Sequence, residues 1–163
     1  MALSRRTFLA LAVAAPASAA AQAARPAGFQ SVSVDVRPLL DKGLGAYAGR
    51  VRAVLQAELA RAFAGRLGAP GPRLVVLVRG ISLNAFTGGG SSRSGWGGGT
   101  NSDYLEGDAL ILDRGGQVLR RHPQLSAVPA SSGGAWYDPA SEDRRLVALA
   151  AHYASWLRRD LLD

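Results

Sequence analysis

The sequence predicts an α+β domain, a two-layer sandwich in which two helices cover one face of a four-stranded mixed sheet. An amphipathic helix at 44–67 lies between two strand-like runs, 29–37 and 73–86, which is the order of a β-α-β unit. Two further strand-like runs surround a Gly-Gly pair and predict a β-hairpin. A second amphipathic stripe ends the chain and predicts the last helix. The expected element order is therefore β-α-β-β-β-α.

The amino terminus has the pattern of an export signal. Its run Ser-Arg-Arg-Thr-Phe-Leu resembles the twin-arginine signal. The residues that carry this resemblance are Arg5, Arg6, Phe8 and Leu9. An alanine-rich apolar run follows, far shorter than the ~20 residues that span a bilayer, and small residues at 21–23 suit cleavage. We therefore predict a cleaved signal at 1–23 and a periplasmic mature protein without a transmembrane segment.

The mature chain, 24–163, is long enough for a single domain with a sizeable core. Loss of two of the 19 Lys and Arg residues with the signal leaves 17 against 12 Asp and Glu residues, a net charge of +5. These basic residues are spread along the chain, so we expect no nucleic-acid partner, while weak attraction to an anionic membrane surface is compatible with them. The absence of cysteine excludes disulfides, thiolate metal sites and a lipidated cysteine.

The first predicted helix carries one apolar stripe at helical spacing. Its members are Leu44, Tyr47, Val51, Val54, Leu55, Leu59 and Ala62. Glu58 lies at the edge of this stripe, where we expect a surface ion pair with Arg61 in preference to a catalytic role. Glycines and prolines at 65–72 then end the helix.

The strands on either side of this helix differ in pattern. Residues 74–78 are apolar at every position, which is typical of a central strand with both faces covered, so Leu77 is expected in the core. Residues 31–36 alternate between valine and polar residues, which is typical of a strand nearer an edge. We expect the two strands to pair in parallel through a right-handed crossover.

A stretch at 87–102 is dominated by Gly and Ser and predicts a loop. It matches neither a phosphate-binding loop nor a dinucleotide fingerprint, and we expect no cofactor. Trp96 lies in this loop, and Trp136 and Tyr137 lie before the last helix. These rings are expected either to meet as a binding platform or, in the more common outcome, to leave Trp136 packed against the core.

The hairpin at 104–122 concentrates carboxylates in its first strand. Glu106 and Asp108 lie two residues apart on one face and could begin a calcium site or an acid–base pair. Calcium needs about six oxygen ligands, more than this run offers. We therefore favour a solvated strand face with Arg120 and Arg121 opposite, and we predict no metal site.

Asp138 is expected to cap the last helix, with Pro139 at its first helical position. The apolar stripe of this helix comprises Leu146, Leu149, Ala150, Tyr153, Trp156, Leu157 and Leu161, and the arginines off the stripe are Arg144, Arg145, Arg158 and Arg159. His152 borders the stripe and His122 lies on another element. A histidine-based metal site would therefore need carboxylates from elsewhere.

The element order and the hairpin sequence Gly-Asp-Ala-Leu-Ile-Leu-Asp-Arg-Gly-Gly-Gln-Val-Leu at 107–119 resemble the small envelope domains of transport-auxiliary proteins and the amino-terminal domain of TolB. Those proteins are commonly lipidated on a cysteine, which this chain lacks. The resemblance implies a role in binding partners or lipids in the envelope without catalysis.

Two classes of function follow. The one we favour is an exported, non-enzymatic envelope protein whose partner is an envelope protein or a glycan. The alternative is a small hydrolase or carbohydrate-active enzyme that uses Glu106, Asp108 or Asp138 together with the loop aromatics. The enzyme requires these carboxylates to converge in one pocket, and the binding protein does not.

Overall fold

The computed structural model describes residues 26–84, 102–135 and 137–163. The predicted signal, Trp96, Trp136 and most of the Gly-rich stretch lie outside these residues. The strands are β1 (Ser31–Asp35), β2 (Arg73–Ser82), β3 (Ser102–Leu112) and β4 (Val118–Pro129). The helices are α1 (Arg37–Asp41), α2 (Gly45–Ala62) and α3 (Ser141–Leu162), with a 3-10 turn η1 (Ala130–Gly133) before α3.

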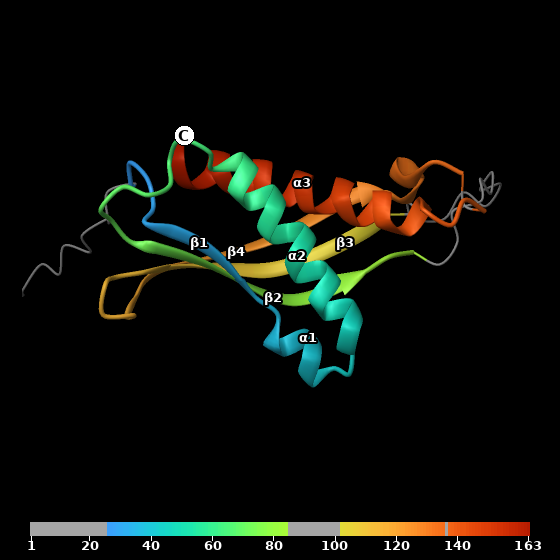
Figure 1. Ribbon diagram of the computed structural model, residues 1–163, viewed down its shortest axis with the longest axis horizontal. Helices are drawn as coiled ribbons and strands as arrows, with labels where there is room; N and C mark the ends of the chain where they lie inside the picture. The colour runs from blue at the N-terminus through green and yellow to red at the C-terminus, as the bar shows by residue number, and fades with distance from the viewer. Residues whose placement is uncertain (1–25, 85–101, 136) are drawn as a thin grey trace, which may run out of the picture.

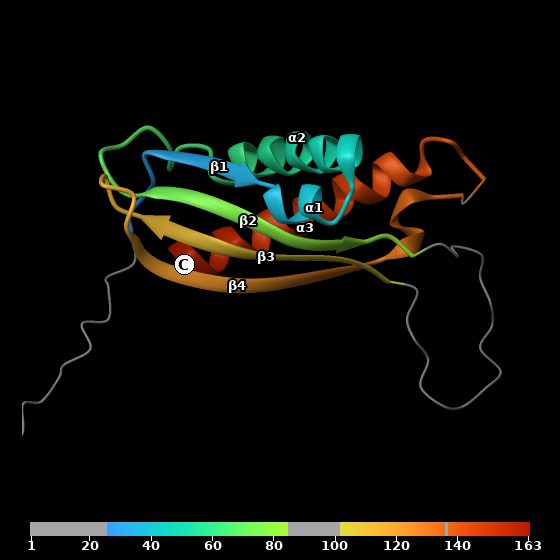
Figure 2. The same cartoon turned by 90° about the horizontal axis from the view of Figure 1, so that it is seen from below.

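The strands form one sheet in the order β1-β2-β3-β4, as a two-layer α+β sandwich requires. Strand β1 pairs with β2 in parallel, and β2 with β3 and β3 with β4 are antiparallel. Helices α2 and α3 lie side by side across one face (Figures 1 and 2). The predicted mixed four-stranded sheet, its parallel first pair, the edge position of β1 and the hairpin are all confirmed. None of the described helices is long and apolar enough to cross a membrane.

Several boundaries differ from the sequence prediction. Helix α2 is shorter than 44–67, because the chain turns at Gly65 and Gly68, where φ is +76° and +85°. Strand β3 already begins at Ser102, which the predicted loop had included. The short helix α1 was not predicted, since five residues are too few for a periodic stripe.

The hairpin was predicted to end at residue 122, and this is wrong: β4 continues to Pro129. Prolines at positions 123 and 129 suggested a loop because proline cannot donate to a strand ladder. Strand β4 lies at the edge of the sheet, where one side of the backbone has no neighbouring strand and proline is tolerated.

The core lies between the sheet and the two long helices. The sheet contributes Leu74, Val76, Val78, Leu105 and Ala109, and the helices contribute Leu55, Leu59, Leu149, Tyr153 and Leu157, all of them buried. Gly107 lets α3 approach the sheet closely, because a Cβ there would lie 3.0 Å from the Tyr153 hydroxyl and 2.9 Å from the Leu77 carbonyl oxygen.

The expectation that both faces of β2 are covered is wrong. Leu77 and Val75 lie on the face opposite the core and are only half-buried. None of the described helices packs on this face (Figure 2). The unbroken apolar run of β2 therefore does not mean that a second layer covers its other face. On that face, neighbouring side chains of the sheet bury Val75 and Leu77 only in part.

Two charged residues predicted at the surface are buried. Arg145 was placed off the apolar stripe of α3, yet it is 7% exposed and donates to Asp103 of β3 from Nε, over 2.8 Å, and from one terminal guanidinium nitrogen. Glu58 does form the expected pair with Arg61, with its Oε2 2.6 Å from the guanidinium, but its own side chain is 7% exposed. The ion pair in each case allows the charge to be buried.

Candidate functional site

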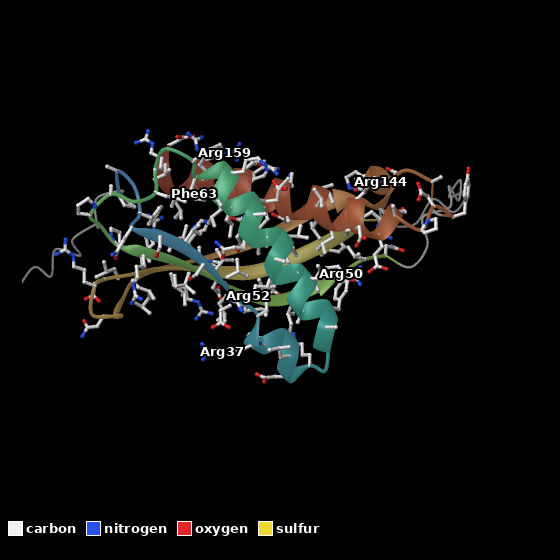
Figure 3. All side chains as sticks on the ribbon, in the orientation of Figure 1. Arg37, Arg50, Arg52, Phe63, Arg144 and Arg159 are labelled. Carbon is white, nitrogen blue, oxygen red and sulfur yellow. The ribbon has the colours of Figure 1, made fainter. Side chains whose placement is uncertain are left out.

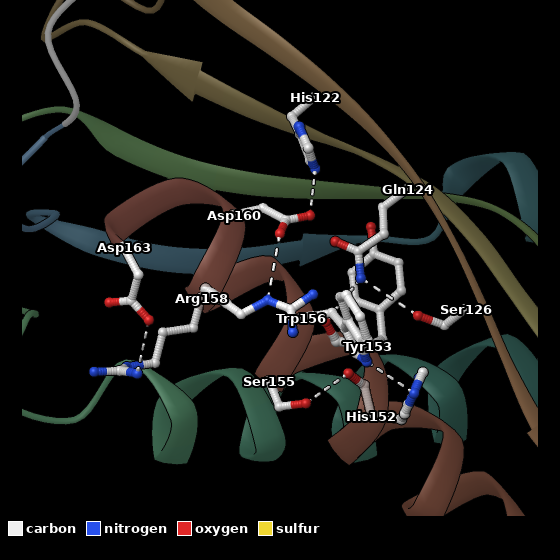
Figure 4. Close-up of polar contacts among 11 residues, drawn as sticks. His122, Gln124, Ser126, His152, Tyr153, Ser155, Trp156, Arg158, Asp160 and Asp163 are labelled. Atoms are coloured by element: carbon white, nitrogen blue, oxygen red, sulfur yellow. Dashed lines mark hydrogen bonds and ion pairs between the residues drawn. The ribbon is translucent and has the colours of Figure 1, made fainter.

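A groove of about 360 Å³ runs between the edge strand β4 and helix α3. Alternate residues of a strand point to the same side, and residues four apart on a helix share a face, so two short series of side chains meet here. The residues that line the groove are His122, Pro123, Gln124, Leu125, Ser126, His152, Trp156 and Asp160. Both histidines of the chain therefore lie at one site (Figure 4).

Trp156 is held in position at the wall of the groove. Its indole Nε1 donates a hydrogen bond to His152 Nε2 over 2.9 Å. The guanidinium carbon of Arg159 lies 3.3 Å from the centroid of the Trp156 ring, a cation–π contact. The side chain is nevertheless 42% exposed. The prediction that Trp156 belongs to the apolar stripe is therefore wrong, and the ring is an ordered, accessible aromatic surface.

The polar atoms of the groove are only partly paired. The indole can only donate, so in a neutral His152 ring the proton is on Nδ1, and this atom is buried without a hydrogen-bond partner among the described residues. Gln124 donates from Nε2 to the Tyr153 carbonyl oxygen over 2.9 Å and to Ser126 Oγ over 3.3 Å. Its Oε1 is likewise buried and unpaired within the described part of the chain. The groove thus has one unpaired donor and one unpaired acceptor.

His122 closes one side of the groove. Its Nε2 lies 3.5 Å from Asp160 Oδ2, which joins β4 to the last turns of α3. Within the described residues no group of three or more His, Cys, Asp or Glu side chains is arranged to hold a metal ion. The arrangement is suited to hydrogen bonding and stacking.

The predicted carboxylate pair lies elsewhere, on the face of the sheet opposite the helices. Glu106 accepts a hydrogen bond from Arg79 over 2.7 Å. Asp108 is fully buried, with Oδ2 2.6 Å from Arg121 and 3.3 Å from Arg79 Nε. The hydrogen bond from Arg121 holds the pKa of Asp108 below its usual value. The predicted pairing with Arg121 is confirmed.

Two details of that prediction are wrong. Asp108 is not solvated, because the two guanidinium groups and the surrounding strand residues cover it. Arg120 does not face the carboxylates: it pairs in register with Ile111, a core residue, and so points to the other side of the sheet.

Asp138 lies on the helix side of the sheet, apart from Glu106 and Asp108. Its Oδ1 accepts the Ala140 N–H over 2.9 Å and its Oδ2 lies 2.7 Å from Arg144. The hydrogen bond from the Ala140 N–H, and to a lesser extent the one from Arg144, lower the pKa of Asp138. The predicted cap is wrong, because α3 begins at Ser141 with Ala140 in the cap position. Asp138 instead orders the turn before the helix.

The three carboxylates of the enzyme alternative therefore do not share a site. Of the predicted aromatic platform, Tyr137 is 75% exposed and belongs to none of the groove walls. Trp96 and Trp136 lie outside the described residues. The groove itself was missed by the sequence interpretation, although the spacing of His152, Trp156 and Asp160 at four residues was a usable signal.

No protein-family model matches the chain, and no curated protein matches it. Among solved structures, a PelC dodecamer from Paraburkholderia phytofirmans is similar, with 11% sequence identity and a TM-score of 0.41 over 80% of this chain and 87% of that one. A minor lipoprotein from Acinetobacter baumannii is similar with 13% identity and a TM-score of 0.38, over 82% of this chain and 93% of that one. At these values the similarity concerns the arrangement of the chain only.

Proposed function

We propose that this chain is an exported, non-catalytic envelope protein that binds a hydroxyl-rich ligand such as a glycan in the groove between β4 and α3. The observation that carries the proposal is the groove itself, which combines an ordered, accessible indole with hydrogen-bonding groups from both walls. Ligand sites in proteins typically combine apolar and aromatic walls with a few placed polar groups.

The chemistry of the walls supports a sugar-like ligand. An indole ring packs well against the C–H face of a pyranose while keeping its N–H in a hydrogen bond. A hydroxyl group both donates and accepts, so it suits polar side chains that line the groove, such as Ser126 and Asp160.

The pKa directions and ion pairs of the three candidate carboxylates weigh against the hydrolase alternative. A general acid at neutral pH needs a raised carboxyl pKa, as burial without a cationic partner provides. Asp108 and Asp138 have lowered pKa values because each accepts hydrogen bonds from an arginine or a backbone N–H. Glu106 is paired with Arg79. We assign these carboxylates a structural role.

Ligand binding can be followed at the two imidazole rings, since the chain has only two histidines and both line the groove. Titration with short neutral oligosaccharides should shift the NMR signals of both rings. We expect Trp156→Ala to weaken binding by about tenfold or more, equal to roughly 1.4 kcal/mol, and Trp156→Phe to retain part of it.

Tyr137→Ala is the matched control, because this aromatic residue is exposed away from the groove. It should leave the affinity unchanged. If Tyr137→Ala weakens binding and Trp156→Ala does not, the ligand binds near the segment before α3 and the groove is the wrong site. If no oligosaccharide shifts either imidazole, the glycan assignment fails.

Export through the twin-arginine route is a separate part of the proposal, supported by the residues Arg5, Arg6, Phe8 and Leu9. Replacing both arginines by lysine should leave an uncleaved precursor inside the cell, since that route reads the arginine pair itself. Cell fractionation and the mass of the product measure this. Arg50→Lys and Arg52→Lys together are the control and should be exported and processed normally. Normal processing of the Arg5/Arg6 variant would exclude the twin-arginine route.

A further inference from the structure

The turn between β3 and β4 carries exposed apolar side chains. Val118 and Leu119 are each 56% exposed, directly after the glycines of the turn. Val118 pairs in register with Leu112 and Arg120 with Ile111, so Leu119 is the extra residue of a β-bulge and has no partner on β3. Both exposed side chains therefore extend the apolar surface at the tip of the hairpin.

Three arginines surround this turn without an ion-pair or hydrogen-bond partner among the described residues. Arg73 begins β2 and pairs in register with Leu112 at the end of β3, and its guanidinium lies 3.5 Å from the position of a Cβ on Gly116. Arg114 lies in the turn and is exposed, and Arg120 follows Leu119. The turn carboxylate, Asp113, accepts the backbone N–H of Gln117 over 2.8 Å. Positive charge is therefore available beside the apolar tip.

Several exposed arginines away from the hairpin turn are closed into ion pairs: Arg37 with Asp35, Arg50 with Asp143, and Arg144 with Asp138. Figure 3 shows Arg37 and Arg52 near the middle of the long axis, away from the hairpin turn. The hairpin turn, the start of β1 and the carboxyl end of α3 lie together at one end of the molecule (Figure 1). The arginines of α3 at this end lie beside acids, Arg158 with Asp163 and Arg159 with Asp160, so the unpaired arginines here, among the described residues, are those of the hairpin turn.

We propose that this hairpin end docks on an anionic phospholipid surface. Val118 and Leu119 enter the interfacial region, and Arg73, Arg114 and Arg120 contact lipid phosphates. Apolar burial combined with attraction to anionic headgroups is the general basis of peripheral membrane binding. A guanidinium fits a phosphate through paired N–H donors, so unpaired arginines at the rim suit this partner. The docking depends neither on the export route nor on the groove ligand.

The test uses residues 24–163, which contain every described element, mixed with vesicles of phosphatidylcholine with or without phosphatidylglycerol. The protein should sediment with the anionic vesicles only, and added salt should weaken binding through screening. The variant R73Q/R114Q/R120Q should bind about a hundredfold more weakly, from about 1 kcal/mol or fivefold for each arginine. The variant V118S/L119S should bind the vesicles about tenfold more weakly, because less apolar area enters the interface.

Arg52→Gln is the matched control, because Arg52 is an exposed arginine of α2 away from the hairpin turn (Figure 3), and binding of this variant should stay within about twofold of the parent protein. Circular dichroism and thermal melting establish that each variant is folded. Equal binding to both kinds of vesicle, or unchanged binding of the triple variant, would overturn the proposal. If inorganic phosphate displaces the protein more strongly than chloride at equal ionic strength, the arginines form a site for free anions instead.

Discussion

Replacing Arg145 by methionine should lower the free energy of unfolding by about 3–5 kcal/mol. The change leaves Asp103, which is fully buried, without its cationic partner. Arg145 Nε donates to Asp103 Oδ2 over 2.8 Å, and a terminal guanidinium nitrogen also donates to the Asn84 carbonyl oxygen over 2.7 Å. Urea denaturation with a check that the m-value stays constant measures the loss.

The exposed pair of Arg50 and Asp143 is the matched control, since its side chains are 51% and 61% exposed. Arg50→Met should cost less than about 1 kcal/mol because solvent screens this pair. The double variant Arg145→Met/Asp103→Leu should recover part of the stability, since it removes the isolated charge. A loss below about 1 kcal/mol for Arg145→Met alone would show that water reaches Asp103.

This buried pair has a consequence for the segment at 85–101, whose own structure lies outside the described residues. Asn84 precedes the segment and Asp103 follows it closely. Asp103 Oδ1 accepts the Asn84 N–H over 2.9 Å, and Arg145 contacts both residues. One arginine of α3 therefore joins the two ends of the segment to each other and to the helix layer.

Leu149→Ala should cost about 2–5 kcal/mol of unfolding free energy, whereas Leu77→Ala should cost less than about 2 kcal/mol. Leu149 is fully buried between α3 and the sheet, so its removal leaves a cavity. Leu77 is half-buried on the face without a helix, where water can fill the space. Thermal or urea unfolding of both variants provides the comparison.

Leu125→Ala serves as the surface reference for this pair, because Leu125 is 65% exposed and its replacement should change stability by no more than about 0.5 kcal/mol. Equal losses for Leu77→Ala and Leu149→Ala would mean that the open face of the sheet is covered in solution. A small loss of stability for Leu149→Ala would mean that this side of α3 does not face the core.

The sequence by itself determined the types and order of the four strands and the two long helices, and the mixed sheet. These depend on local patterns: the alternation at 31–36, the turn glycines of the hairpin, and the helical spacing of Leu146, Leu149 and Tyr153. Each pattern reflects which side of an element avoids water, and that is written in residues close together in the chain.

Only the tertiary structure decided which surfaces meet. The pairing of Arg145 with Asp103 joins residues far apart in the sequence, and no local pattern distinguishes Arg145 from its solvated neighbour Arg144. The groove depends on β4 continuing past Pro123 and lying beside α3, so His122 and Trp156 reach one site only after the layers pack. Burial of a charge and convergence of side chains are properties of the packed layers, and for that reason periodicity along the chain does not reveal them.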